Sequence, residues 1–246
     1  MSRNFELLRQ VEKEQESLGT PLASPPAPPL HARPRFSKSA LAREEEVKLV
    51  QRLFLSGPGA PRTVVFCGVE PGYAPGWICA RASEVLAAQV SGSVCAVDAN
   101  FRVPHLHQYL EVESQLGLTD AALDLGPVQN FAQQTRRSNL WLMPCGSQVS
   151  DPRILLRPDR LQARLADLRT QFDYILISTQ PVHLSADAVA LGQISDGVVL
   201  VLEANSSRRE VAQEAKLTLE AVNVKLLGAV LHNRTFPIPE VLYRRL

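Results

Sequence analysis

Apolar runs without polar alternation recur along most of this chain, separated by longer amphipathic stretches. Six of these runs are rich in Val, Leu and Ile and predict strands: 63–68, 93–98, 140–143, 173–178, 197–202 and 226–231. A strand that is apolar on both sides must be covered on both faces of its sheet. The pattern therefore predicts an α/β fold, with a doubly wound, largely parallel sheet flanked by helices.

Segments with helical spacing of apolar residues alternate with these strands. They predict helices over 39–55, 77–90, 104–111, 118–123, 127–134, 158–171, 184–192 and 207–222. The alternation of strand and helix is the βαβ rhythm of parallel sheets. We find no internal repeat and no sign of a second core, so one folded domain is expected.

The first part of the chain differs from the rest. Residues 4–18 predict a short, weak amphipathic helix, and six prolines follow between Gly19 and Pro34. Prolines remove N–H donors and favour extended backbone, so this stretch predicts a disordered linker, either without function or acting as a tether or docking peptide. We expect this helix and linker over 1–38, the domain over 39–235 and a tail over 236–246.

Composition indicates which partners and which cellular compartment to expect. The 246 residues include 26 basic and 25 acidic side chains, a net charge of +1, which gives no indication of a nucleic-acid partner. The four cysteines are far apart and lack C-x-x-C spacing, as expected of small buried hydrophobes in a reducing compartment. No signal peptide or membrane-spanning run is found, so we expect a cytoplasmic protein, with peripheral attachment to the inner membrane face as an alternative.

The loop after the first predicted strand has the position of a phosphate-binding loop but lacks its residues. Such a loop needs glycines to bring amides to phosphate, a Lys for the terminal phosphates and a hydroxyl for Mg²⁺. Gly72 and Gly76 are present, but neither a Lys nor a Ser or Thr follows them. Pro75 also lacks an N–H. The loop either retains weak anion binding through its amides or is a plain turn from strand to helix.

The second predicted strand ends in Asp98, which is the best candidate for a catalytic residue. A carboxylate there could hold Mg²⁺ through water or accept a proton, or it could instead cap the following turn by accepting backbone N–H groups. Arg102 could pair with Asp98 or with a ligand phosphate. His105 and His107 have no further metal-ligating neighbour in sequence, so no metal site is predicted.

The strand over 173–178 ends in Ser178. A Walker B strand would end in Asp, whose charge supports Mg²⁺. A neutral hydroxyl can contact a metal-bound water but cannot supply that charge, so we expect weaker metal affinity.

In this order, these residues resemble the bacterial tyrosine kinases (BY-kinases) of capsule and exopolysaccharide biosynthesis. These belong to the deviant-Walker P-loop NTPases, which also include division-site and partition ATPases. The resemblance runs from about Ala42 to Asn233 and is most specific over Val97–His107, which is similar to the second Walker motif of the family. Further similar stretches are 115–120, 142–146, 172–182 and 196–204. The resemblance implies a P-loop NTPase-like fold.

The departures from the family fall on its nucleotide motifs. The family loop reads Pro-Gly-x-Gly-Lys-Ser/Thr-Thr, and this chain has Pro75, Gly76 and Trp77 where Lys-Ser/Thr-Thr would stand. Ser178 stands at the Walker B position. Asn100 replaces a second Asp that is usual in the second Walker motif.

Two other family features are reduced. The C-terminal tyrosine cluster, which is autophosphorylated in the family, is represented by Tyr243 alone. The oligomer-contact motif is matched by Glu45 and Lys48 but not by Gln51. A homo-oligomer therefore stays an open alternative.

The leading hypothesis is a catalytically degenerate relative of these kinases that needs no cofactor. It would act as a binding or regulatory component of polysaccharide biosynthesis and export, docked at the cytoplasmic face of a polysaccharide co-polymerase or another membrane export protein. The first alternative is an active autokinase that uses ATP and Mg²⁺, with Asp98 in the site and Tyr243 as acceptor. The second alternative is a deviant-Walker positioning ATPase, which nucleotide-dependent dimerisation would reveal.

Overall fold

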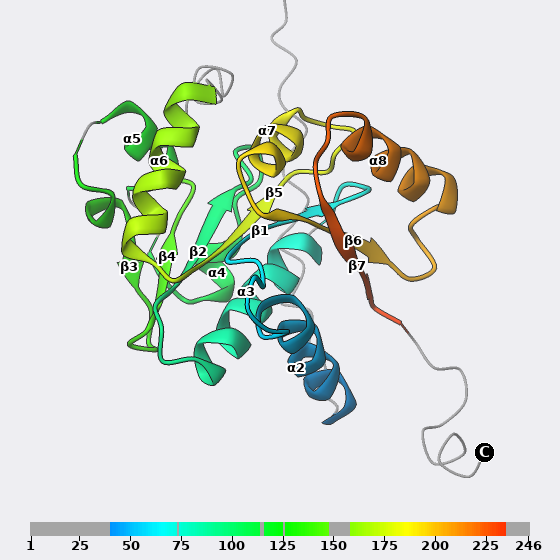
Figure 1. Ribbon diagram of the computed structural model, residues 1–246, viewed down its shortest axis with the longest axis horizontal. Helices are drawn as coiled ribbons and strands as arrows, with labels where there is room; N and C mark the ends of the chain where they lie inside the picture. Colours follow the sequence, from blue (N-terminus) through cyan, green and yellow to red (C-terminus); the bar gives the residue numbers. More distant parts are fainter. Residues whose placement is uncertain (1–39, 73, 114–115, 125, 148–157, 235–246) are drawn as a thin grey trace, which may run out of the picture. The chain divides into compact units, whose positions relative to one another are not determined.

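The computed structural model describes residues 40–234 apart from residues 73, 114–115, 125 and 148–157 (Figure 1). All of them belong to the second of two units, Met1–Ser39 and Ala40–Leu246, into which the chain divides. The helix expected over 4–18, the Pro-rich linker and Tyr243 lie outside the described residues. The three domain boundaries therefore stay predictions.

The described residues form a seven-stranded, mostly parallel sheet, as expected. The strands are β1 (Thr63–Gly68), β2 (Val94–Ala99), β3 (Gln133–Gln134), β4 (Leu140–Met143), β5 (Tyr174–Thr179), β6 (Gly197–Glu203) and β7 (Leu226–His232). Their order is β3-β4-β2-β5-β1-β6-β7, and all neighbouring pairs are parallel except β3 with β4. All six predicted strands are confirmed.

The helix predicted over 127–134 is wrong. A single 3-10 turn, η1 (Val128–Phe131), is followed by the short strand β3. Val128 and Phe131 are three residues apart and both buried, which a 3-10 turn achieves as well as an α-helix. Gln133 and Gln134 then pair with β4, a long-range interaction that the local apolar pattern does not indicate.

The helices match the prediction to different degrees. They are α2 (Ala40–Phe54), α3 (Ala74–Gln89), α4 (Leu106–Tyr109), α5 (Leu118–Leu123), α6 (Pro158–Gln171), α7 (Asp187–Gln193) and α8 (Arg209–Ala221). The bounds of α5 and α6 coincide with those expected. Helix α3 begins three residues earlier than predicted, because Pro75 fits the first turn of a helix, where its missing N–H would have no partner. Helix α4 is two residues shorter than predicted at each end, and α7 begins three residues later and ends one residue later. Helices α2 and α8 are shorter by one or two residues at each end.

Helices cover both faces of the sheet (Figure 1), as the unbroken apolar strands require. On one face, α2, α3 and α4 pack against alternate strand residues such as Val64, Phe66 and Leu176. On the other face, α5, α6, α7 and α8 pack against the residues between them, including Val65 and Ile177. All four cysteines are buried and unpaired, as expected.

Parallel strand register brings the candidate residues to one edge of the sheet. Ser178 of β5 lies between Asp98 of β2 and Phe66 of β1. The loops that follow β1, β2 and β5 therefore lie side by side at the carboxyl edge, where ligands bind in open parallel sheets. Among the helices that the structure describes, none has the length and apolar character needed to cross a membrane.

Candidate functional site

The chain packs tightly where β1 turns into α3. Pro75 is buried, and a Cβ atom on Gly68 would lie 3.1 Å from its Cγ and 2.9 Å from the carbonyl oxygen of Glu70. Glycine is therefore required at 68, because the backbone approaches this closely. Pro75 offers no N–H, so the first turn of α3 presents fewer amides to an anion than a phosphate-binding loop does. Gly72 is exposed, and a side chain there would meet nothing within 4 Å.

Aromatic side chains pack around the first turn of α3. The rings of Trp77 and Tyr109 meet edge to face, with centroids 5.4 Å apart and an interplanar angle of 78°. The ring of His105 stacks on Tyr109, with centroids 6.5 Å apart. A Cβ atom on Gly76 would lie 3.5 Å from Cε2 of Tyr109. Aromatic atoms thus lie in ordinary contact distance of the position where the family has its hydroxyl.

Arg81 connects this cluster to α2. Its Nε and Nη2 donate to the two carboxylate oxygens of Glu46, at 3.1 and 2.6 Å, and Nη1 donates to Glu84. The guanidinium also lies over the ring of Trp77, 6.0 Å from its centroid. Hydrogen bonding to Glu46 raises the pKa of Arg81 against burial. A bidentate, partly buried ion pair of this kind orients Arg81 and so supports Trp77.

Asp98 is 1% exposed, and its carboxylate holds the backbone of the next turn. One oxygen accepts the N–H of Asn100 at 3.1 Å, and the other accepts those of His105 at 2.8 Å and Leu106 at 2.9 Å. Burial raises the pKa of Asp98 to about 6, while these three hydrogen bonds oppose the rise. The capping interaction that the sequence left open is therefore present. A role in chemistry at the same carboxylate stays a prediction.

Ser178 is buried directly behind the first turn of α3. It is 2% exposed, and its Oγ would lie 3.7 Å from a Cβ atom on Gly76. The next residue, Thr179, is buried as well, and its hydroxyl has no hydrogen-bond partner among the described residues. The structure thus brings Gly76, Asp98 and Ser178 together, as the family resemblance implies.

The sequence allowed two contacts for Arg102, one with Asp98 and one with a ligand phosphate, and the second stays a prediction. Arg102 is exposed, and no hydrogen bond or ion pair joins it to Asp98, although both residues are described. Its charge instead acts on Asp187 at the start of α7, which is 2% exposed. Burial raises the pKa of Asp187, and Ser185 and Arg102 lower it. The proximity of Arg102 to Asp187 comes from the fold, because these residues follow different strands.

Several residues that hold Mg-ATP in the family are replaced at the corresponding positions of this chain. The loop has no amine, no hydroxyl follows it, and Ser178 stands at the Walker B position. No group of three or more His, Cys, Asp or Glu side chains within the described ranges is placed to hold a metal ion. The contacts Trp77–Tyr109 and Glu46–Arg81 are features that sequence reasoning missed. Only the helical i, i+4 spacing of Trp77 and Arg81 hinted at them.

Comparison with known proteins finds relatives among the bacterial tyrosine-protein kinases. No family model matches the chain. Tyrosine-protein kinase YwqD of Bacillus subtilis is 29% identical over 150 residues, which are 61% of this chain and 63% of the relative. Tyrosine-protein kinase wzc of Salmonella typhimurium is 22% identical over 170 residues, 69% of this chain and 24% of the relative. This chain is a relative of the bacterial tyrosine-protein kinases. It matches less than two thirds of the length of either.

Solved structures confirm the fold of this kinase relative. The chimerical protein CapA2B2 has a TM-score of 0.72 at 22% identity, covering 80% of this chain and 86% of that one. The kinase domain of Escherichia coli tyrosine kinase ETK has a TM-score of 0.69 at 18% identity, with coverages of 85% and 88%. The cell division ATPase MinD of Pyrococcus furiosus reaches 0.60 at 23% identity, with coverages of 75% and 78%. The described fold is thus that of P-loop NTPases.

Proposed function

We propose that this kinase relative is a binding or regulatory component of exopolysaccharide or capsule biosynthesis that does not transfer phosphate. The observation that supports this most strongly is the first turn of α3. It consists of Ala74, Pro75, Gly76 and Trp77, and the ring of Tyr109 packs against it. Side-chain packing stands where a kinase has its phosphate-binding and metal-binding groups.

The physics of phosphoryl transfer gives this observation its weight. Such enzymes work almost entirely by positioning the phosphate and stabilising its charge. Here the clamp amine is missing at Pro75, the hydroxyl at Gly76 and the metal-supporting carboxylate at Ser178. One loss could be compensated by a neighbouring group. Three losses in one site leave too little electrostatic stabilisation for useful turnover.

The process and the partner are carried over from the family resemblance. We propose docking at the cytoplasmic face of a polysaccharide co-polymerase or another membrane export protein. The exposed residues Arg102 and Val103, which belong to the loop between β2 and α4, are suited to such a contact because they combine a charge with apolar surface.

Calorimetric titration with Mg-ATP and Mg-ADP tests the proposal. The native protein is compared with a restored variant that combines Ala74→Gly, Pro75→Lys, Gly76→Ser, Trp77→Thr and Ser178→Asp. Trp77→Thr is included because the indole packs at the site. A serine fits at 76, since its Cβ would meet Tyr109 and Ser178 only at 3.5 and 3.7 Å. We expect binding by the restored variant and none at the loop of the native protein.

A matched variant makes the titration decisive. The same five changes together with Asp98→Asn should bind Mg-ATP more weakly than the restored variant if the scaffold binds as in the family. Micromolar binding of Mg-ATP to the loop of the native protein would contradict the proposal. It would instead support the autokinase alternative, for which the pKa of about 6 at Asp98 is suitable for a base. Phosphate incorporation at Tyr243 would then be measured.

A further inference from the structure

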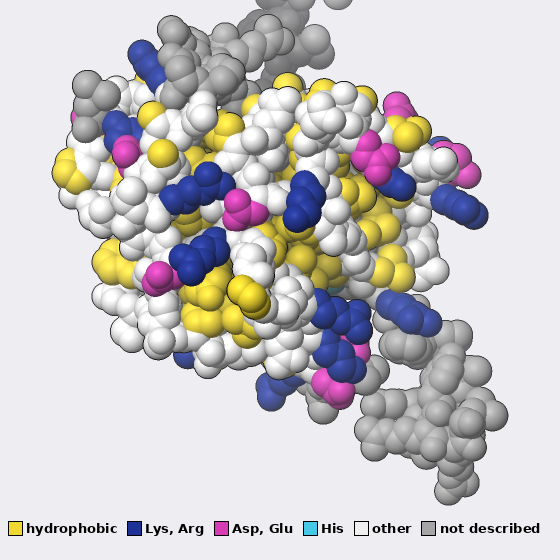
Figure 2. Space-filling view, viewed as in Figure 1, with side chains coloured by type: hydrophobic (Ala, Val, Ile, Leu, Met, Phe, Trp, Pro, Cys, Tyr) yellow, Lys and Arg dark blue, Asp and Glu magenta, His cyan; other side chains and the backbone are white. Residues whose placement is uncertain are grey.

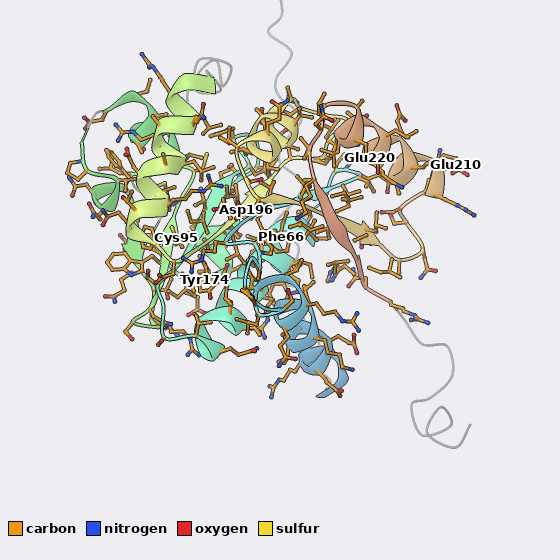
Figure 3. The ribbon with its side chains drawn as sticks, viewed as in Figure 1. Phe66, Cys95, Tyr174, Asp196, Glu210 and Glu220 are labelled. Carbon is orange, nitrogen blue, oxygen red and sulfur yellow. The ribbon has the colours of Figure 1, made fainter. Side chains whose placement is uncertain are left out.

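A cavity among the described residues lies at the opposite, amino edge of the sheet, and none of the loop residues Glu70–Trp77 lines it. It has a volume of about 500 Å³ and lies where β1, β5 and β6 begin, within the size range of small-molecule sites. Its charged lining residues are Arg62, Arg169, Asp173, Asp196 and Lys225. In Figure 2, basic side chains gather around an acidic one in the middle of the view, in the region where Figure 3 labels Asp196.

The acidic groups of the cavity are already engaged by the protein. One oxygen of Asp196 accepts the backbone N–H groups of Arg62 at 2.7 Å and Thr63 at 2.8 Å, and the other accepts from Arg169 at 3.3 Å. One oxygen of Asp173 accepts from the backbone N–H and the hydroxyl of Ser93 at 2.8 and 3.0 Å. The negative charges are therefore partly neutralised by local donors.

The basic groups are arranged differently. Arg169 is held in place, because its Nε donates to the buried Thr63 hydroxyl at 3.0 Å and its Nη2 donates to Asp196. Nη1 of Arg169 has no partner among the described residues. The exposed side chains of Arg62 and Lys225 also form no ion pair with any residue that the structure describes. Three cations thus face one cavity with only part of their hydrogen-bonding capacity used.

We propose that this amino-edge cavity binds a small molecule that carries a phosphate group. A planar guanidinium held by the protein presents donors in a geometry that matches phosphate oxygens. The two exposed cations, Arg62 and Lys225, add the charge that a dianion requires. Carboxylate ligands carry less charge and fewer acceptor oxygens, so phosphate fits this donor set better. The phosphate could be inorganic or part of an ester such as a nucleotide.

Titrations with inorganic phosphate and with ATP, without Mg²⁺, test the site on the full chain. Nuclear magnetic resonance spectra should show shifts of the Gly59, Thr63 and Lys225 amides, while the Gly76 amide stays unchanged. Arg62→Gln with Lys225→Gln should weaken binding at least tenfold. Arg208→Gln with Lys216→Gln removes the same charge from exposed positions on and next to α8, outside the cavity lining, and should leave the affinity within about twofold.

The outcomes also separate this site from the carboxyl edge. Binding of ATP but not of inorganic phosphate would assign the cavity to phosphate esters, and binding of both would assign it to the phosphate group alone. No binding at millimolar concentration of either probe would overturn the proposal. Equal loss of affinity in both double variants would do so too, because it would mean a general charge effect. ATP binding that persists in Arg62→Gln/Lys225→Gln and shifts the Gly76 amide would come from the loop and count against the proposed function. ATP binding that persists in this variant without that shift would overturn the cavity proposal.

Discussion

Two segments at the carboxyl edge, Glu70–Trp77 and Asp98–His107, come from the same family site but have changed to different degrees. The first has no Lys, Ser or Thr at the positions where the family loop has Lys-Ser/Thr-Thr. The second retains Asp98, and that carboxylate also holds three backbone N–H groups. The difference teaches that a motif residue that also holds the backbone has a structural reason to be present, whether or not the site performs chemistry. The presence of Asp98 alone is therefore poor evidence of catalysis.

The largest expected effect is on stability in Asp98→Ala. This change leaves the N–H groups of Asn100, His105 and Leu106 without their acceptor in a buried place. It should lower the free energy of unfolding by about 3 to 5 kcal/mol, since each unsatisfied buried donor costs about 1 to 3 kcal/mol. Urea denaturation followed by circular dichroism measures the loss. Asp98→Asn, which keeps acceptor capacity, should lose clearly less. If Asp98→Ala were as stable as the native protein, Asp98 would not have the structural role that distinguishes its segment from Glu70–Trp77.

The next effect is on the pH dependence of stability. The pKa of Asp98 rises from 3.8 to about 6 on folding, so the folded state binds the proton more tightly. Its contribution to stability is therefore largest at low pH, falls as pH rises from about 4 to about 6, and is constant above. The total change is about 3 kcal/mol at most, because each pKa unit corresponds to about 1.4 kcal/mol.

Asp98→Asn is the control for this pH effect. Other groups titrate nearby, among them Asp120, whose pKa is lowered by hydrogen bonds with Ser147 and Gly117 against burial. The difference in unfolding free energy between the native protein and Asp98→Asn, measured at several pH values, isolates Asp98. A difference that stays constant between pH 4 and pH 6 would show that this carboxyl group is not perturbed.

A smaller effect is expected where α2 supports the aromatic cluster. Arg81→Ala removes the pair with Glu46 and the contact with Trp77, and should cost about 1 to 2 kcal/mol, more than an exposed ion pair. A double-mutant cycle with Glu46→Gln should show coupling between the two sites. The indole fluorescence of Trp77 should change in Arg81→Ala but not in Lys48→Ala, whose ion pairs are exposed. If the fluorescence of Trp77 were unchanged in both Arg81→Ala and Lys48→Ala, the ion pair with α2 would not support the aromatic cluster.

The smallest effect is expected at the loop itself. Gly76→Ser should change the free energy of unfolding by less than about 0.5 kcal/mol, because the new Cβ would make only ordinary contacts and serine is no worse than glycine within a helix. Thermal unfolding measures it, with Gly68→Ser as the contrasting variant. At Gly68 a Cβ would lie 2.9 Å from a backbone oxygen, so that variant should be strongly destabilised. If Gly76→Ser and Gly68→Ser changed the free energy of unfolding by the same amount, close backbone packing at Gly68 would not distinguish the two glycines.

The sequence by itself determined the sheet and the departure of the nucleotide motifs. Five of the six long strands are mostly buried and produce unbroken apolar runs, which is why they were found. The edge strand β7 is only half-buried, but its residues Leu226–Leu231 are apolar or glycine, so the same pattern indicated it. No Lys, Ser or Thr occurs between Gly72 and Trp77, so their absence from the loop does not depend on how the chain is aligned with the family motif. Helices α5 and α6 were found with their bounds, because their apolar spacing is local and no ligand loop interrupts it.

Only the tertiary structure decided which contacts these residues make. Trp77 meets Tyr109, and Arg169 meets Asp196, across segments that lie far apart in sequence. The strand β3 exists because β4 is beside it, although its own residues carry no strand pattern. Asp98 caps a turn because the chain after β2 folds back over it. Local periodicity carries no information on such pairs, since they form only when the whole sheet brings distant segments together.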